Sequence, residues 1–150
     1  VLIFCEKNNM GLNIELKPNL GFEKKNVIAI AKLLRNFNFT NQYYFSSFDW
    51  NSIILMKELL PSAYYGLLIH DFNNNVFLSS ALEICKKYNF SCCGFNNKII
   101  NTDIINEVKM NGLITTVYSE NNLKPNEANE LWSNGIKSIF IDDPSEFKIS

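Results

Sequence analysis

The stretch Gly11-Leu-Asn-Ile-Glu-Leu-Lys-Pro18 combines the pattern of a β-strand with two side chains of opposite charge. Apolar and polar residues alternate from Leu12 to Lys17, and Pro18 ends the ladder because proline has no backbone N–H to donate. Since successive side chains of a strand point to opposite faces, Glu15 and Lys17 point the same way. Taken alone, Glu15 and Lys17 could either form a functional pair or belong to the polar face of an ordinary half-exposed strand. The rest of the chain decides between these two interpretations.

The composition indicates one globular domain, residues 1–150, or a piece of a larger protein. The chain has 150 residues, 47% of them apolar, and no apolar run long enough to cross a bilayer. Its 14 Lys and Arg residues nearly balance 15 Asp and Glu residues, which gives a formal net charge of −1. We therefore expect no nucleic-acid partner and no transmembrane segment, and the sequence does not define an oligomeric state.

The cysteines and the start of the chain indicate in which cellular compartment the protein is expected. Cys5, Cys85, Cys92 and Cys93 have no metal-ligand spacing, and three of them lie within apolar runs. We expect buried thiols of a reducing compartment rather than disulfides, and we predict a cytoplasmic protein. The chain begins at Val1 without a secretion signal, which suggests that an upstream part has been removed.

Short β-rich runs alternate with segments of helical periodicity, which is typical of repeated βα units and a parallel sheet. The expected strands are residues 12–17, 42–47, 63–69, 91–95, 113–118 and 138–141. The expected helices are residues 23–36, 49–60, 76–88, 103–111 and 125–133, and residues 1–9 are expected to be the last turns of an earlier helix. We therefore expect the given sequence to begin partway through a fold.

Six parallel strands can form an open doubly wound sheet or part of a closed (β/α)8 barrel, and periodicity does not separate the two. In a barrel, polar residues at the carboxyl ends of the strands gather at one rim, where barrel enzymes place their chemistry. The candidates at these ends are Lys17, Ser47, His70 and Asn96.

Six segments follow one another in an order that resembles a known family. They are Asn13-Ile-Glu-Leu-Lys-Pro18, Ser46-Ser-Phe-Asp-Trp50, Leu59-Leu-Pro61, Gly66-Leu-Leu68, Gly112-Leu-Ile-Thr-Thr-Val-Tyr118 and Gly135-Ile-Lys-Ser-Ile-Phe-Ile-Asp-Asp-Pro144. Together they resemble the C-terminal part of the glycerophosphodiester phosphodiesterase family, a group of (β/α)8-barrel enzymes. The resemblance implies the α/β class and an incomplete TIM barrel of about six βα units, with the first two missing.

The resemblance also implies roles for Glu15 and Lys17. In the family, the glutamate of this motif ligates a divalent metal and the lysine helps to hold the substrate phosphate. A hard cation such as Mg²⁺ or Ca²⁺ takes carboxylate oxygens, and an ammonium two residues further on the same face can contact a phosphodiester. The alternative is a structural ion pair at a barrel rim.

The next motif ends the second strand, so the resemblance places Ser47 and Phe48 at the same opening. We expect Ser47 to contact substrate and Phe48 to form an apolar wall against the glycerol or the leaving group. Alternatively, Phe48 is a core aromatic residue. For Asp49 we favour the role of a helix cap.

Two motifs depart from the family pattern. Where the family commonly has Trp-Thr-Val-Asn, the tryptophan and asparagine positions are Thr115 and Tyr118, so Tyr118 is the expected substrate-contacting residue on this side. Asp142 and Asp143 resemble a metal pair, but we favour a terminating role for them at the last strand and turn.

The family's catalysis depends on two histidines, in a His-Arg and a His-Asp motif, with a Glu-x-Asp pair of metal ligands between them. None of these segments is present in this chain. The one histidine, His70, precedes Asp71 and imitates the His-Asp dipeptide, but it lies several elements downstream of the family's position. We therefore expect no catalytic residue in this chain and no activity from it alone.

The predicted function of the complete protein is hydrolysis of glycerophosphodiesters, in lipid metabolism, to glycerol 3-phosphate and an alcohol with a divalent cation. A noncatalytic truncated barrel that serves as a binding or structural module is the main alternative. An open receiver-like or nucleotide-binding sheet is less favoured because no Gly-rich phosphate loop follows a strand. A phospholipase D-like toxin of the same superfamily would need secretion and disulfides, of which the sequence shows no sign.

Overall fold

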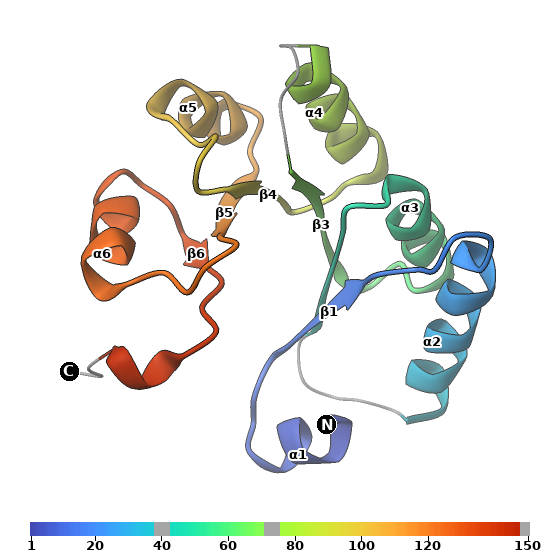
Figure 1. The fold of residues 1–150 in the computed structure, drawn as a ribbon. Coiled ribbons are helices and arrows are strands. Elements are labelled where there is room, and N and C mark those ends of the chain that lie inside the picture. The colour runs from blue at the N-terminus through green and yellow to red at the C-terminus, as the bar shows by residue number, and fades with distance from the viewer. Residues whose placement is uncertain (38–42, 71–75, 148–150) are drawn as a thin grey trace. The chain divides into compact units, whose positions relative to one another are not determined.

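The computed structural model describes residues 1–37, 43–70 and 76–147 (Figure 1). The chain divides into two compact units, Val1–Leu67 and Leu68–Ser150. Each unit consists of parallel strands that alternate with helices along the chain. Every helix among the described residues is too short or too polar to cross a membrane.

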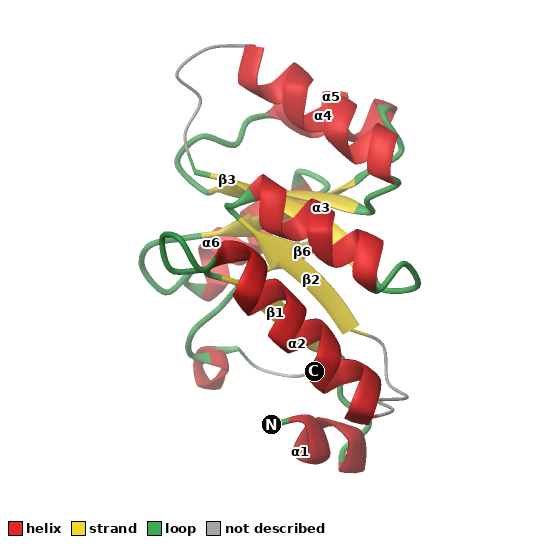
Figure 2. Cartoon of the chain, turned by 90° about the vertical axis from the view of Figure 1, so that its right-hand side faces the viewer, coloured by secondary structure: helices red, strands yellow, loops and turns green. Residues whose placement is uncertain are grey.

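The first unit contains three parallel strands in chain order. Its elements are α1 (Leu2–Lys7), β1 (Leu12–Leu16), α2 (Glu23–Phe37), β2 (Tyr43–Ser47), α3 (Trp50–Leu59) and the start of β3 (Tyr64–Ile69). In the register, Glu15 of β1 lies opposite Ser46 of β2, and Phe45 of β2 lies opposite Tyr65 of β3. Figure 2 shows α2 and α3 side by side over the strands, and the Arg35 guanidinium of α2 donates to the Leu59 carbonyl at the end of α3.

The beginning of α3 is fixed by Asp49. Its Oδ1 accepts hydrogen bonds from the backbone N–H groups of Asn51 at 3.1 Å and Ser52 at 3.4 Å, and its Oδ2 accepts one from the Ser52 hydroxyl at 2.8 Å. These bonds satisfy N–H groups that the first helical turn leaves unpaired. The expected role of Asp49 as a helix cap is confirmed.

Tyr65 connects β3 to the end of α3 in the core of the first unit. Its ring stacks on Phe45 with a centroid distance of 5.4 Å, and neither side chain is exposed. Its hydroxyl lies 3.2 Å from the Met56 carbonyl oxygen and 2.5 Å from that of Leu60, to which it donates. Burial, with a smaller effect of Tyr43, raises the pKa of this phenol, so it remains a donor throughout the physiological range.

The second unit repeats the same alternation. Its elements are the end of β3, α4 (Val76–Tyr88), β4 (Cys92–Asn96), α5 (Thr102–Met110), β5 (Ile114–Tyr118), α6 (Pro125–Ser133), β6 (Ser138–Ile139) and the 3-10 turn Pro144–Glu146. Strand β5 pairs in parallel with β4 and β6, and Asn96 lies opposite Tyr118. A hydrophobic core cluster of this unit consists of the buried residues Ile105, Val117, Leu123 and Ile136.

The strands and helices expected from the sequence are confirmed with small shifts at their ends. Residue 42, the expected start of the second strand, lies outside the described residues. The largest difference is the last strand, which covers Ser138–Ile139 instead of residues 138–141. The Phe140 N–H still donates to the Val117 carbonyl at 2.8 Å. The N–H groups of Asp142 and Asp143 instead donate to the Asn122 side chain, so the strand pairing has ended there.

Candidate functional site

One face of the β1–β2 pair carries a polar cluster. Glu15 lies opposite Ser46 in the register, and the Ser46 hydroxyl lies 3.2 Å from Asn13 Oδ1, to which it donates. Asn13 and Glu15 are two residues apart on one strand, so strand alternation places both on the face that Ser46 shares. The cluster therefore consists of a carboxylate, an amide and a hydroxyl that lie next to one another.

Lys17 extends this cluster beyond the end of β1. Its Nζ lies 3.3 Å from Glu15 Oε1, and the two side chains are 74% and 27% exposed. Oε1 is shielded from solvent and accepts no hydrogen bond, so the contact with Lys17 is an ion pair without hydrogen-bond geometry. A shielded carboxylate oxygen without a hydrogen bond is costly unless a cation approaches it. Glu15 thus has the chemistry of a metal ligand with coordination capacity left over.

A complete metal site would need more ligands than Glu15. Mg²⁺ and Ca²⁺ take about six or more oxygen ligands. Within residues 1–37, 43–70 and 76–147, no group of three or more His, Cys, Asp and Glu side chains could hold a metal ion. The described residues could supply one carboxylate ligand of such a site, Glu15, and the amide oxygen of Asn13 lies on the same strand face.

Ser47 lies apart from this cluster. It is opposite Leu16 in the register and fully buried. Its hydroxyl donates to the Leu16 carbonyl at 2.7 Å and accepts from the Asp49 N–H at 3.0 Å, so it links β1, β2 and the start of α3. Ser46, not Ser47, shares the strand face of Glu15, and the expected contact of Ser47 with substrate stays a prediction.

Phe48 and Lys17 lie together, as expected. Both line a cavity of about 320 Å³ at the end of β1 and β2, and the Phe48 side chain is 41% exposed. Phe48 is therefore a cavity wall and not a core aromatic residue.

Tyr118 lies at the carboxyl end of β5 in the second unit. Its hydroxyl donates to the Ile69 carbonyl at 2.8 Å and lies 3.4 Å from His70 Nδ1. With its hydrogen committed to Ile69, the Tyr118 oxygen can accept from an Nδ1–H of His70. Thr115 lies on the other face of β5, the face of the core residue Val117, so the two positions that depart from the family pattern do not share a face.

An ion pair lies near His70 in the same unit. Lys98 Nζ donates to Glu120 Oε2 at 2.5 Å, and both side chains are exposed. The hydrogen bond from Lys98 and its charge lower the pKa of Glu120, with a smaller effect from His70. His70 thus contacts the Tyr118 hydroxyl and lies close enough to Glu120 to influence its charge, while Asp71 lies outside the described residues.

Asp142 and Asp143 belong to the turn after β6. Their backbone N–H groups both donate to Asn122 Oδ1, at 2.9 and 3.1 Å. Asp143 Oδ1 also accepts from the N–H of Ser145 at 2.9 Å and from its hydroxyl at 2.6 Å, and these bonds lower the pKa of Asp143. The terminating role favoured for this pair is confirmed at Asp143.

The four cysteines are free and buried. Cys85 and Cys93 lie closest, with a distance of 3.4 Å between their Sγ atoms. The hydrogen bond with Cys85, together with burial, raises the pKa of the Cys93 thiol. They are core thiols, as expected.

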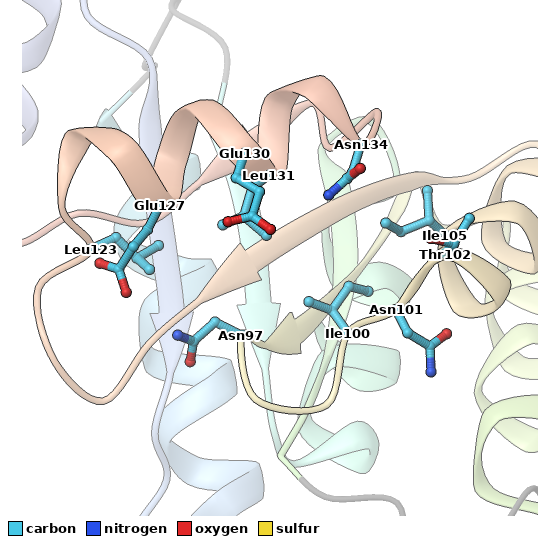
Figure 3. A pocket seen from close by; sticks show the side chains of 10 residues that line it. All are labelled: Asn97, Ile100, Asn101, Thr102, Ile105, Leu123, Glu127, Glu130, Leu131 and Asn134. Atoms are coloured by element: carbon cyan, nitrogen blue, oxygen red, sulfur yellow. The ribbon is translucent and has the colours of Figure 1, made fainter.

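A further cavity of about 320 Å³ lies in the second unit, between α6 and the segment after β4 (Figure 3). Glu127 and Glu130 of α6 and Asn97 lie around it. Glu127 Oε2 accepts a hydrogen bond from the Lys124 N–H at 2.8 Å, which is a capping interaction of α6. None of the site residues expected from the sequence lines this cavity.

Comparison with known proteins identifies the fold. A family model described as "Glycerophosphoryl diester phosphodiesterase family" matches residues 2–146. No curated protein matches the chain. Solved structures do, among them an Oleispira antarctica phosphodiesterase in complex with the product sn-glycerol-3-phosphate. It has 20% identity and a TM-score of 0.79, and the match covers 93% of this chain and 54% of that one.

Two further structures agree. A candidate glycerophosphodiester phosphodiesterase from Galdieria sulphuraria has 14% identity and a TM-score of 0.79, with 95% of this chain and 58% of that one covered. A glycerophosphodiester phosphodiesterase from Parabacteroides distasonis has 14% identity and a TM-score of 0.69, with 91% and 54% covered. The chain spans little more than half the length of these structures, and the expected fold class, an incomplete (β/α)8 barrel, is confirmed.

Proposed function

This chain belongs to the glycerophosphoryl diester phosphodiesterase family, a family of phosphoric diester hydrolases, and we propose that the complete protein hydrolyses glycerophosphodiesters. The products would be sn-glycerol 3-phosphate and an alcohol, as in the breakdown of deacylated phospholipids. The Oleispira antarctica structure holds the same phosphate product. We further propose that the protein acts in the cytoplasm and that residues 1–150 form part of one catalytic domain.

The observation that carries this proposal is the pairing of Glu15 with Lys17. Glu15 Oε1 accepts no hydrogen bond although it is shielded from solvent, which suits a ligand of Mg²⁺ or Ca²⁺. Lys17 is mostly exposed and 3.3 Å from that oxygen, so its ammonium can reach a phosphate next to the cation. When bound, the cation neutralises charge that develops on the phosphoryl oxygens.

The remaining residues of the cluster orient these two groups. The Ser46 hydroxyl bonds to Asn13 on the strand face that carries Glu15, and Phe48 forms an apolar wall beside Lys17. In a (β/α)8 barrel the carboxyl ends of all strands open to one face, which is where substrates bind. Tyr118 is the last residue of β5 and so lies at the carboxyl end of that strand. We therefore propose it as a further substrate contact.

We propose that the general acid and base of this reaction are two histidines. Transfer of a phosphoryl group from a diester requires one proton to leave the attacking oxygen and one to reach the leaving oxygen. The chain has a single histidine, His70. We propose that the catalytic histidines lie elsewhere in the complete protein and that residues 1–150 alone are inactive. The same observation favours the second candidate, a noncatalytic binding module.

A substitution in the complete protein tests the proposal. Glu15→Gln keeps the size of the side chain but removes its charge, so we expect turnover of glycerophosphocholine to fall by at least about 100-fold. Glu58→Gln, which changes an exposed carboxylate of α3, is the matched control and should retain full turnover. If the complete protein releases no glycerol 3-phosphate, the binding module is the better description. If Glu15→Gln retains full activity, the metal ligand is misassigned.

A further inference from the structure

The cavity between α6 and the segment after β4 lies on the other face of β5 from the Tyr118 side chain. Ile105 and Leu123 line this cavity, and both belong to the core cluster that includes Val117 of β5. Since successive strand residues point to opposite faces, Tyr118 points away from that cluster. The volume of about 320 Å³ is within the range of small-ligand pockets. We call it the α6 cavity, and it is separate from the substrate contact proposed at Tyr118.

The polar wall of the α6 cavity is acidic. Glu127 and Glu130 are three positions apart, so they lie on one face of α6. Figure 3 shows their side chains pointing from the helix toward the segment that carries Asn97 and Ile100. Among the described residues that line the cavity there is no Lys, Arg or His. Its lining therefore carries two negative charges and no positive one.

The lysines that adjoin the α6 cavity in sequence are already paired with other carboxylates. Lys124 Nζ donates to Glu146 Oε1 at 2.7 Å, and Lys98 Nζ donates to Glu120 Oε2 at 2.5 Å. Within the part of the chain that the structure describes, no ion pair neutralises either carboxylate of the cavity. The cavity thus has capacity for an added cation.

The α6 cavity also has an amide oxygen that no donor satisfies. Asn97 Oδ1 is shielded from solvent and accepts no hydrogen bond from the described residues. The Asn97 backbone N–H donates to the Tyr118 carbonyl at 2.9 Å, so the residue is held against β5. Because a shielded acceptor without a donor is costly, this oxygen favours a ligand that carries N–H or O–H groups.

An organic cation fits the α6 cavity better than a metal ion. In the ranges 1–37, 43–70 and 76–147, no group of three or more His, Cys, Asp and Glu side chains could hold a metal ion. Four lining residues are instead apolar: Ile100, Ile105, Leu123 and Leu131. Hydrocarbon that packs against them strengthens binding, which a bare ion does not gain. Two carboxylates, an amide acceptor and an apolar wall match an aliphatic chain that carries ammonium groups.

We propose that the α6 cavity binds a short aliphatic diamine, whose ammonium groups contact Glu127 and Glu130 and whose methylene chain packs on the apolar wall. One ammonium N–H also donates to Asn97 Oδ1. Alkyl amines are protonated at pH 7, so a diamine supplies the two positive charges that the lining lacks. This binding involves no covalent step and does not depend on the proposed hydrolysis.

Isothermal titration of putrescine into the complete protein at pH 7 and low salt tests the proposal. Two probes of the same chain length serve as comparisons: butylamine has one ammonium group, and butanediol has none. We expect putrescine to bind, butylamine to bind about three- to fivefold more weakly, and butanediol not to bind, since each exposed ion pair contributes modestly. Added salt should weaken the binding of putrescine.

Two variants locate the binding in the α6 cavity. Glu130→Gln removes a charge without changing the size of the side chain, and Asn97→Ala removes the shielded oxygen but keeps the backbone bond to Tyr118. Each should weaken putrescine about three- to fivefold. Glu83→Gln is the matched control, because Glu83 is an exposed carboxylate of α4 that does not line the cavity, and it should leave the affinity unchanged. Circular dichroism checks that each variant folds.

Each contrary outcome overturns the proposal. If putrescine gives no saturable heat, the cavity holds only water. Equal binding of butanediol would show that charge is not recognised. Binding of Ca²⁺ in place of putrescine would make the cavity a metal site. Putrescine affinity that Glu130→Gln and Asn97→Ala leave intact would place the diamine elsewhere in the protein.

Discussion

Lys17 Nζ lies 3.3 Å from Glu15 Oε1, an oxygen that is shielded from solvent and accepts no hydrogen bond. The two residues are two positions apart, so strand geometry holds them on the same side of β1. Neither charge is neutralised by a full hydrogen-bonded salt bridge, which leaves the carboxylate able to bind a cation and the ammonium able to bind an anion. The divalent cation and the phosphodiester that we propose would bind one group each.

The first prediction concerns Lys17. In the complete protein, Lys17→Ala removes a charged hydrogen bond to phosphate, which is worth about 1.5–3 kcal/mol, so kcat/KM for glycerophosphocholine should fall about 10- to 100-fold. Steady-state kinetics measure this effect. Lys32→Ala, at an exposed position of α2, is the control. Equal kinetics for the two variants would contradict a phosphate contact at Lys17.

A second prediction separates Ser46 from Ser47. Ser47→Ala leaves the Leu16 carbonyl and the Asp49 N–H without their partner, so the free energy of unfolding should fall by about 1–3 kcal/mol. Ser46→Ala removes only a bond to Asn13 on the Glu15 face, so we expect it to reduce turnover more than stability. Denaturant unfolding and kinetics of both variants in the complete protein check this. The reverse pattern would place Ser47 at the substrate.

The third prediction concerns metal affinity. Because the described residues supply one matched carboxylate, isothermal titration of Mg²⁺ or Ca²⁺ into residues 1–150 should show weak binding or none. Circular dichroism of the same sample serves as the control for folding. A dissociation constant below about 1 μM, which corresponds to about 8 kcal/mol of binding free energy, would mean that the metal site lies elsewhere, for example at Asp142 and Asp143.

The fourth prediction follows from the single histidine. Residues 1–150 alone should not hydrolyse glycerophosphocholine, and in the complete protein His70→Ala should retain turnover within a few-fold of the parent. His70 is exposed and contacts the Tyr118 hydroxyl, which suits a residue that supports the rim. Release of choline by the isolated chain, abolished by His70→Ala, would instead make His70 the acid or base.

The last prediction is a pH dependence. Lys98 lowers the folded-state pKa of Glu120, so this pair stabilises the fold at pH values above the ordinary carboxyl pKa, and the contribution is lost as the pH falls through the lowered pKa. The difference in unfolding midpoint between the parent and Glu120→Gln should therefore be present at pH 7, vanish in acid and shrink with added salt. Glu83→Gln is the exposed control without this ion pair. A difference that persists in acid would assign the effect to packing.

The sequence by itself determined the features that depend on local pattern. Alternation between Leu12 and Lys17 predicted β1 and the shared side of Glu15 and Lys17, and the residue before Trp50 predicted the cap of α3. Both follow from geometry within a few residues of chain, where backbone period and hydrogen-bonding reach leave few alternatives.

Only the tertiary structure decided which residues meet across strands. Ser46 and Ser47 are chemically identical neighbours, and the register of β1 with β2 alone places Ser46 beside Glu15 and Ser47 beside Leu16. The bond from Tyr118 to Ile69 likewise joins residues 49 positions apart. A shift of one residue in strand pairing exchanges the two faces without changing any local pattern, so the site depends on a register that only the packed sheet fixes.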